Sequence, residues 1–210
     1  MSLSTNWWKD IEVVDIVDDP KELDRLFQLA SKDAHRNSGN YSDLEKRYEG
    51  YLSFHVIYKQ GNPVAFSGVY EHPKWKDCVR IADRSYYFPE YRVKSLKRLP
   101  DIQSVFRQKV DAVSRIFVPL HLDIAKKNGK TPFISIQETN RRQAMVAFLN
   151  HVNELHDIEM VMLDGMRYVG TSDHKVDSDT LWHSVGCLKK HKKIVDDCLE
   201  YIQRYELESQ

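Results

Sequence analysis

The chain lacks an excess of charge of either sign, since 31 Lys and Arg residues balance 31 Asp and Glu residues among 210. A zero formal net charge argues against a protein that binds nucleic acid through general electrostatics. The longest apolar runs are far shorter than the roughly 20 residues needed to span a bilayer. Residues Met1–Trp8 include no basic segment followed by an apolar one, so we expect no secretory signal. The composition therefore predicts a cytoplasmic protein with neither a nucleic-acid nor a membrane partner.

Cysteine is also scarce, and its spacing excludes the usual cysteine motifs. Cys78, Cys187 and Cys198 are odd in number and widely separated, and no pair forms a CxxC. Reduced thiols are therefore expected. The nine histidines include no HxH or HExxH spacing. We accordingly expect no metal site.

The first half of the chain predicts one strand, a helix and then three further strands. Ile11–Val17 is β-branched and alternating, and Asp19 can cap a helix whose first position suits Pro20. A short second helix is expected at Ser42–Tyr48. Three β-rich runs follow, at Tyr51–Lys59, Pro63–Glu71 and Cys78–Phe88. Short connections, including the one at Gln60–Asn62, imply an antiparallel meander.

A long amphipathic helix is the strongest helical signal in the sequence. It follows Asp101 and carries apolar residues at three- and four-residue intervals as far as Ile124. Pro119 lies inside this pattern and should kink or split the helix. A short apolar strand, Thr131–Gln137, comes next. The helix therefore forms a crossover from the strand that ends near Phe88, and such a crossover usually joins parallel neighbours.

The C-terminal third predicts two more helices and further strands. One helix is capped by Thr139 or Asn140 and extends through Leu155. Asp164-Gly165 then predicts either a hairpin, or a single bulged strand that pairs with residues 181–188. A terminal helix should follow over residues 189–206. Its buried side is expected to include Ile194, Cys198 or Leu199, Ile202 and Tyr205.

The order of these elements predicts an α/β (α+β) fold with a mixed, mostly antiparallel sheet. One central crossover pair is parallel, and helices cover both faces. A single domain over residues 1–210 is expected, in which 190–208 form an appended helix. An apolar content of 41% and a charged content of 30% suit such a globular domain.

Two local motifs resemble GNAT-type N-acetyltransferases, over roughly residues 11–190. One is Phe88-Pro89-Glu90-Tyr91-Arg92, where a strand ends and an Arg follows. The other is Ile134-Ser135-Ile136-Gln137-Glu138-Thr139-Asn140, followed by Ala144, Ala147 and Phe148. In this family, the resemblance implies, the parallel strands splay apart and acetyl-CoA enters between them.

The resemblance implies a site for acetyl-CoA, used as co-substrate, around the turn after residue 88. The implied cofactor-binding residues are Tyr87, Phe88, Arg92, Val93, Lys94, Ser95, Lys97 and Asn140. Family members usually place glycines at the positions of Val93, Ser95 and Lys97. Glycine lets the backbone approach a phosphate closely, whereas basic side chains can bind phosphate by charge.

A few side chains are candidates for acid–base chemistry. Asp83 and Glu138 are candidate bases for the incoming ammonium. The proton for the leaving thiolate comes from solvent or from another residue, for which Tyr86 or Tyr87 is the candidate. Many family members carry a Tyr four residues after the motif's Ala. Counting from Ala144 reaches Phe148, which cannot donate a proton.

Two hypotheses of function follow. The leading one is an N-acyltransferase that moves an acetyl or acyl group from acyl-CoA to an amine acceptor. The other is a catalytically inactive GNAT-like scaffold that binds a protein or peptide, which the missing loop glycines and the missing Tyr favour. A dimer is compatible with either hypothesis.

Overall fold

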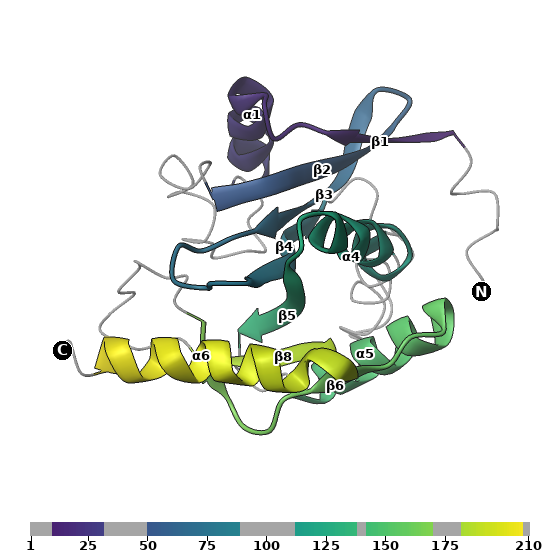
Figure 1. Ribbon diagram of the computed structural model, residues 1–210. Helices are drawn as coiled ribbons and strands as arrows, with labels where there is room; N and C mark the ends of the chain where they lie inside the picture. The colour runs from purple at the N-terminus through teal and green to yellow at the C-terminus, as the bar shows by residue number, and fades with distance from the viewer. Residues whose placement is uncertain (1–9, 32–49, 89–111, 138–141, 170–181, 208–210) are drawn as a thin grey trace. The chain divides into compact units, whose positions relative to one another are not determined.

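The chain folds into a mixture of strands and helices. A computed structural model describes residues 10–31, 50–88, 112–137, 142–169 and 182–207 (Figure 1). The strands are β1 (Ile11–Asp15), β2 (Tyr51–Lys59), β3 (Asn62–Tyr70), β4 (Cys78–Tyr87), β5 (Thr131–Gln137), β6 (Met160–Met162), β7 (Arg167–Tyr168) and β8 (Trp182–Leu188). The helical elements are α1 (Pro20–Ser31), the π-helical turn η5 (Val113–Phe117), α4 (Val118–Lys127), α5 (Arg142–His156), the 3₁₀ turn η6 (Lys189–His191) and α6 (Lys192–Leu207).

The described strands form a mixed sheet. Their hydrogen-bonded order is β1-β2-β3-β4-β5-β8-β6, and β7 also pairs with β8. The β4–β5 pair is parallel, whereas β1–β2, β5–β8, β6–β8 and β7–β8 are antiparallel. This order confirms the predicted α+β class, with its mostly antiparallel sheet and its central parallel crossover pair.

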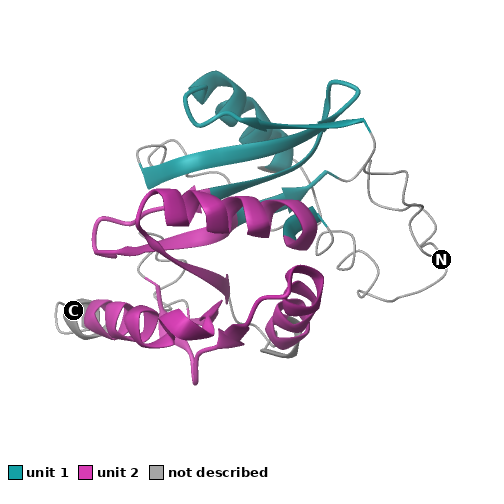
Figure 2. Cartoon of the chain, turned by 45° about the vertical axis from the view of Figure 1, so that its right-hand side comes forward, with its two compact units in different colours: residues 1–68, 84–113 teal, residues 69–83, 114–210 magenta. Residues whose placement is uncertain are grey.

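Two compact units make up the chain (Figure 2). Unit 1 comprises residues 1–68 and 84–113, and unit 2 comprises residues 69–83 and 114–210. The three boundaries fall inside β3, inside β4 and inside η5. The number of independent domains stays a prediction. Among the described residues, no helix is long and apolar enough to cross a membrane.

In unit 1, α1 begins where its sequence predicts. The Glu22 N–H donates to the Asp19 carboxylate at 3.0 Å, which satisfies one of the free donors at the helix N-terminus. Pro20 occupies the first helical position, where its missing N–H costs nothing. The buried residues of α1 are Leu23, Leu26, Phe27 and Ala30.

Aromatic rings fill the core of unit 1. Phe27 of α1 packs edge-on against Phe54 of β2 and Phe66 of β3, at centroid distances of 5.3 and 5.5 Å. Phe66 in turn stacks on Tyr86 of β4 at 5.4 Å. Each ring contributes roughly 1.5–3 kcal/mol through burial. The β2–β3 turn consists of Gln60 and Gly61, both with positive φ, as a type I′ hairpin requires.

In unit 2, the crossover helix is interrupted near Pro119, as predicted. The π-helical turn Val113–Phe117 precedes α4, in which Pro119 lies in the first turn. Proline has no N–H, so Pro119 cannot donate a hydrogen bond to a carbonyl group in the preceding turn of the helix. That carbonyl group needs another donor. His156 of α5 lies 2.6 Å from the Ser114 carbonyl oxygen and supplies that partner. The predicted start of this helix near Asp101 and the predicted helix Ser42–Tyr48 lie outside the described residues.

The Asp164-Gly165 turn does not close a hairpin between its two flanks. Both β6 and β7 pair with β8 instead, so the second alternative, a single bulged strand, is the correct one. Gly165 has φ of 74°, which a glycine adopts without strain. Inside strand β8, Gly186 leaves room for Leu149 of α5, because an added Cβ would lie 2.9 Å from both Leu149 methyl carbons.

The terminal helix buries Leu199 and Ile202, as predicted, but not Ile194. Ile194 is 47% exposed, so its predicted burial is wrong, and the buried residues are Val195, Leu199 and Ile202. Ile194 and Val195 are adjacent and both apolar, so the periodicity of the sequence alone did not decide which of them is buried. In the observed rotation of α6, Lys192 pairs with Asp164 and Asp196 pairs with Arg167, while Ile194 points outward.

Candidate functional site

The parallel ladder between β4 and β5 is short. It joins Cys78 to Thr131, Val79 to Pro132 and Arg80 to Phe133. Strand β5 continues four residues past Phe133, to Gln137, and pairs with β8 along this length. The N-terminal part of β4 is therefore paired with β5, and the ladder ends after Arg80.

A backbone irregularity lies in β4, just beyond Arg80, the last residue of this strand that pairs with β5. Ala82 has φ of 54°, a left-handed conformation that costs a non-glycine residue roughly 1–2 kcal/mol. Its N–H donates to Nδ1 of His121, in α4, at 3.1 Å. His121 is fully buried, and because Nδ1 accepts, its neutral ring carries the proton on Nε2. The bulge is thus held by a side chain from the crossover helix.

The bulge changes the direction of Asp83. In a regular strand, Arg80 and Asp83 would point to opposite faces. The left-handed Ala82 shifts this alternation, as β-bulges do, and Asp83 forms an ion pair with Arg80. Both side chains are buried, at 7% and 5% exposure. Each charge offsets the desolvation of the other, because removal from water is costly for an unpaired ion.

Two further polar side chains complete what we call the β4–β8 polar cluster, defined as Arg80, Asp83, Ser135 and His183. Arg80 lies 3.4 Å from the Ser135 hydroxyl, on β5. Directly paired residues share a face of the sheet, and so do alternate residues of one strand. On β5, Phe133 pairs with Arg80 of β4, and Gln137 pairs with His183 of β8. Ser135 lies between Phe133 and Gln137, so Arg80, Ser135 and His183 lie on one face. The opposite face carries Gly186, against which Leu149 packs.

His183 is a buried imidazole whose pKa lies well below its ordinary value. Burial, with the nearby Arg80 charge, lowers the pKa of His183 to about 3, although Asp83 opposes this effect. The ring is therefore neutral at physiological pH. Its Nδ1 is buried and makes no hydrogen bond to any described residue. A buried polar atom of this kind is a candidate ligand contact.

Aromatic rings surround the guanidinium of Arg80. Its central carbon lies 5.9 Å from the Tyr70 ring centroid and 5.8 Å from that of Trp75. Trp75 in turn packs edge-on against Phe133 at 5.0 Å. Cation–π contacts of this type contribute about 0.5–2 kcal/mol each when desolvated. They fix Arg80, and through it Asp83.

The described part of the chain contains four of the predicted site residues. Asp83 belongs to the polar cluster of unit 2. Tyr86, Tyr87 and Phe88 belong to unit 1 and are buried, at 1%, 5% and 3% exposure. Tyr86 stacks on Phe66 and meets Phe88 edge-on at 5.1 Å, so its ring has a packing role. Its role as proton donor stays a prediction.

The other predicted site residues lie outside the described residues. They are Arg92, Val93, Lys94, Ser95, Lys97, Glu138 and Asn140. Phe148, which the resemblance in sequence matched to a Tyr position, is 6% exposed on α5. It shares this buried row with Leu149, which packs on the face of β8 opposite the polar cluster.

Sequence reasoning missed Arg80, Ser135 and His183 as candidate site residues. Arg80 and His183 are polar residues inside otherwise apolar strands, and this is the signal by which they could have been found. Within the described ranges, no group of three or more His, Cys, Asp or Glu side chains is placed to hold a metal ion.

Comparison with known proteins gives structural matches only. No protein-family model matches the chain, and no curated protein matches its sequence. The ribosomal-protein-S18-alanine N-acetyltransferase from Escherichia coli has 11% identity and a TM-score of 0.50, covering 85% of this chain and 92% of its own. A protein assigned as a phosphinothricin N-acetyltransferase has 12% identity and a TM-score of 0.51, covering 84% and 96%.

A further match contains acetyl-CoA. It is a protein from Salmonella typhimurium assigned as an acetyltransferase, with 13% identity and a TM-score of 0.45, covering 85% of this chain and 93% of its own. The matches across most of the chain show that it has a GNAT-like fold and is divergent in sequence.

Proposed function

We propose that the protein is an acyl-CoA-dependent N-acyltransferase. The observation that carries the proposal is the end of the β4–β5 ladder after Arg80, on a GNAT-like fold. At this point the bulge at Ala82 turns Asp83 into the polar cluster. The acceptor is an amine.

The strand edge of β5 beyond Phe133 suits a thioester. Backbone N–H groups along a strand edge can donate to an acyl carbonyl oxygen, which gains negative charge in the transition state. These donors are fixed in advance, because β5 is held along its other edge by β8. The chain can therefore stabilise the oxyanion without a dedicated side chain.

Asp83 is the described carboxylate proposed as the base. The acceptor must lose a proton from its ammonium before nitrogen attacks, and Asp83 would take that proton. The new C–N bond then forms as the C–S bond breaks, and CoA leaves as a thiolate. The nitrogen gives its second proton to solvent as the amide forms, and the thiolate takes a proton from solvent. Free thiols have pKa values near 8.5, so a thiolate is a tolerable leaving group. The reaction thus does not require a Tyr at position 148.

The pyrophosphate of CoA is assigned to the basic residues that follow β4. Arg92, Lys94 and Lys97 carry side-chain charge in the segment where family members use glycines. Charge-assisted hydrogen bonds contribute about 1.5–3 kcal/mol each. The basic side chains would then bind the pyrophosphate in part by charge, where family members bind it through backbone N–H groups.

Acetyl-CoA titration of the full chain tests the proposal. Calorimetry should detect binding, and acetyl-CoA at about 100 times its dissociation constant should stabilise the fold by roughly 2.7 kcal/mol. The double variant Arg92→Ala/Lys94→Ala should bind at least about tenfold more weakly, since it loses two charge-assisted contacts. A thiol-release assay with a panel of amines then measures turnover.

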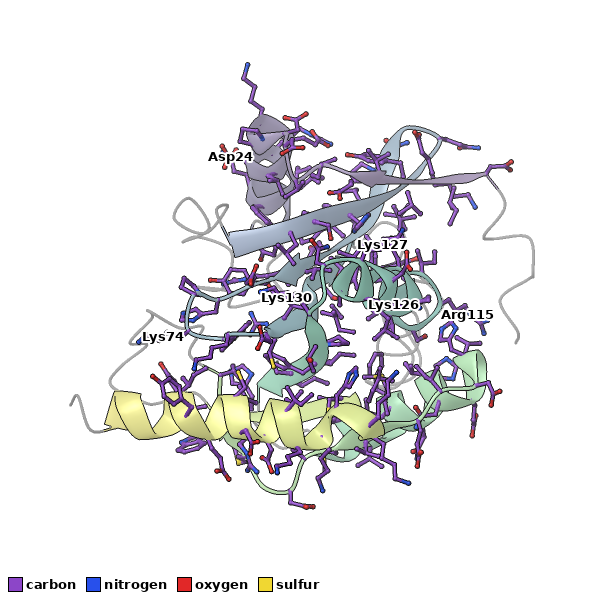
Figure 3. All side chains as sticks on the ribbon, in the orientation of Figure 1. Asp24, Lys74, Arg115, Lys126, Lys127 and Lys130 are labelled. Atoms are coloured by element: carbon purple, nitrogen blue, oxygen red, sulfur yellow. The ribbon has the colours of Figure 1, made fainter. Side chains whose placement is uncertain are left out.

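Two exposed lysines provide the matched control. Lys126→Ala/Lys127→Ala removes the same charge from the end of α4 and should leave CoA affinity unchanged (Figure 3). If the parent chain fails to bind acetyl-CoA, the transferase proposal is wrong. Binding without turnover on any amine would favour the GNAT-like scaffold instead.

A further inference from the structure

The three cysteines, far apart in sequence, all belong to unit 2. Cys78 is the first residue of β4, Cys187 lies in β8, and Cys198 lies in α6. Cys78 and Cys187 are 1% and 0% exposed, and Cys198 is half-buried. All three are free thiols.

Strand register places the two strand cysteines on one face of the sheet. Cys187 pairs with Phe133, which pairs with Arg80, and Cys78 is two residues before Arg80 on the same strand. Directly paired residues share a face, and so do alternate residues of a strand. The thiols of Cys78 and Cys187 therefore point to the same side.

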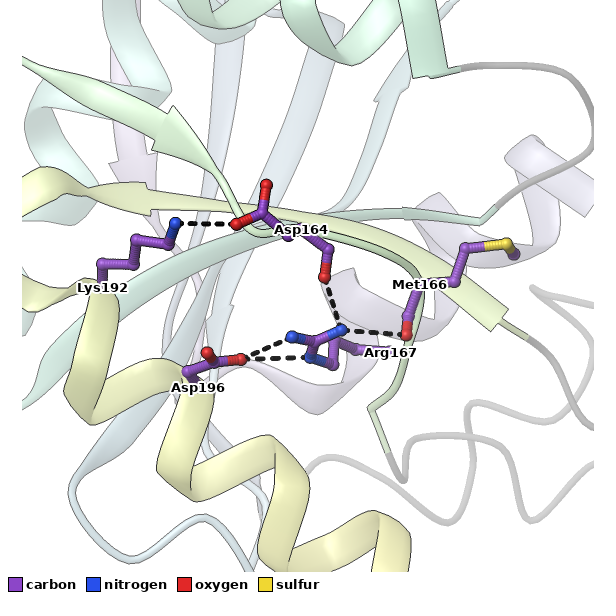
Figure 4. A network of polar contacts seen from close by, with 5 residues as sticks. All are labelled: Asp164, Met166, Arg167, Lys192 and Asp196. Atoms are coloured by element: carbon purple, nitrogen blue, oxygen red, sulfur yellow. Dashed lines mark hydrogen bonds and ion pairs between the residues drawn. The ribbon is translucent and has the colours of Figure 1, made fainter.

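Ion pairs at its first turns hold α6 in position (Figure 4). Lys192 Nζ lies 3.0 Å from the Asp164 carboxylate, and Arg167 Nη2 lies 2.7 Å from that of Asp196. Arg167 also donates to the backbone carbonyl of Asp164 at 2.6 Å. These contacts fix α6 along one border of its buried row.

Cys198 lies on the other border of that row, against the start of β4. Its thiol is hydrogen-bonded to that of Cys78. One turn further along α6, Tyr201 receives Lys76 over its ring at 5.7 Å, two residues before Cys78. Two neighbouring contacts thus join the same stretch of α6 to the same end of β4.

The two thiols differ in reactivity. The hydrogen bond from Cys78 lowers the pKa of Cys198, and the same bond together with burial raises the pKa of Cys78. Burial raises the pKa of Cys187 to about 11. Cys198 is half-buried whereas Cys78 is 1% exposed, so a peroxide reaches Cys198 first. Cys198 is therefore the attacking group and Cys78 its neighbouring resolving group.

We propose that Cys198 and Cys78 form a reversible disulfide, a thiol-oxidation site that takes a hydroperoxide as oxidant and joins α6 to β4. This inference is independent of acyl transfer. Cys198 sulfur attacks one peroxide oxygen, the O–O bond breaks, and the leaving oxygen takes a proton to give water or an alcohol. The product is a sulfenic acid on Cys198.

Cys78 completes the reaction. Its sulfur loses its proton and attacks the sulfur of Cys198, the S–O bond breaks, and hydroxide leaves as water. One peroxide thus removes two electrons from two thiols. The two sulfurs must approach from hydrogen-bond contact to about 2.05 Å, which small side-chain rotations can provide.

Peptide mapping of the full chain tests this site. The reduced protein is treated with hydrogen peroxide, its remaining thiols are blocked under denaturing conditions, and the digest is analysed by mass spectrometry without reduction. The expected result is a linked Cys78–Cys198 peptide, one blockable thiol at Cys187, and recovery of all three thiols with dithiothreitol. A linkage through Cys187, or between two chains, would overturn the proposal.

Serine variants separate the two roles. Cys198→Ser should remove peroxide consumption, whereas Cys78→Ser should stop at a sulfenic acid on Cys198, which dimedone traps. Cys187→Ser is the matched control and should still form the bond. The result on the parent chain stands even if a variant folds poorly. Unchanged peroxide consumption in a folded Cys198→Ser chain would sink the assignment of the attacking thiol.

Discussion

His183 should make the stability of the protein depend on pH. In the native state it is neutral, because burial and the Arg80 charge lower its pKa to about 3. In the unfolded chain its pKa returns to the usual value of 6.5. As pH falls below 6.5, the unfolded state therefore takes up a proton that the native state does not. The stability associated with His183 is present above pH 6.5 and is lost as pH falls toward 3.

The size of this effect follows from the two pKa values. At pH 5, proton binding lowers the free energy of the unfolded state by about 2 kcal/mol, while the native state gains almost nothing. At pH 7.5 proton binding to His183 changes the free energy of neither state appreciably. The free energy of unfolding should therefore fall by about 2 kcal/mol between pH 7.5 and pH 5 through His183 alone. His55 and His191, whose pKa values burial also lowers, add in the same direction.

Urea denaturation of the parent and of His183→Gln at both pH values isolates the contribution of this residue. Glutamine cannot titrate, so the variant should lose about 2 kcal/mol less stability than the parent on going to pH 5. Val185→Ala, a buried truncation on the same strand, is the control and should shift both values equally. An identical pH dependence in parent and His183→Gln would refute the reasoning.

Two further predictions concern unit 1 and are measured by the same denaturation assay. Gly68→Ala should lower the free energy of unfolding by about 1–3 kcal/mol or more. The new Cβ would lie 2.6 Å from the Tyr51 ring and 2.8 Å from the Phe54 ring, and neither ring can move aside in a packed core. Equal stability would show that the core is loosely packed there. Asp19→Ala should cost about 1 kcal/mol through loss of the α1 cap, whereas Asp18→Ala, equally exposed, should cost almost nothing. Equal losses would point to a general charge effect rather than capping.

Local sequence signals predicted the elements of the fold well. The strand Tyr51–Lys59 and the strand Thr131–Gln137 have the predicted bounds. Capping by Asp19 and the interruption near Pro119 also depend on residues close in sequence. The crossover rule then gave the parallel β4–β5 pair, because a helix between two strands restricts how those strands can pair.

Features that depend on distant contacts were predicted less well. The turn chemistry of Asp164-Gly165 is correct, but the pairing of its flanks is decided by β8, which both flanks join. In α6, Ile194 and Val195 are equally apolar, and Asp196 selects the buried one through its pair with Arg167. In both cases the alternatives, hairpin or bulged strand and Ile194 or Val195, fit the local sequence equally well. Only contacts with residues distant in sequence decided between them.

The candidate site is the hardest part to read from the sequence. Arg80 and His183 are about a hundred residues apart and meet only through the register of three strands. Asp83 joins them because Ala82 is left-handed, and an alanine gives no sign of that conformation in the sequence. The strain at Ala82 is offset by its hydrogen bond to the buried His121, which maintains an irregularity that a regular strand would avoid. Strain held in place by surrounding structure often marks functional sites, and here it lies where the β4–β5 ladder ends.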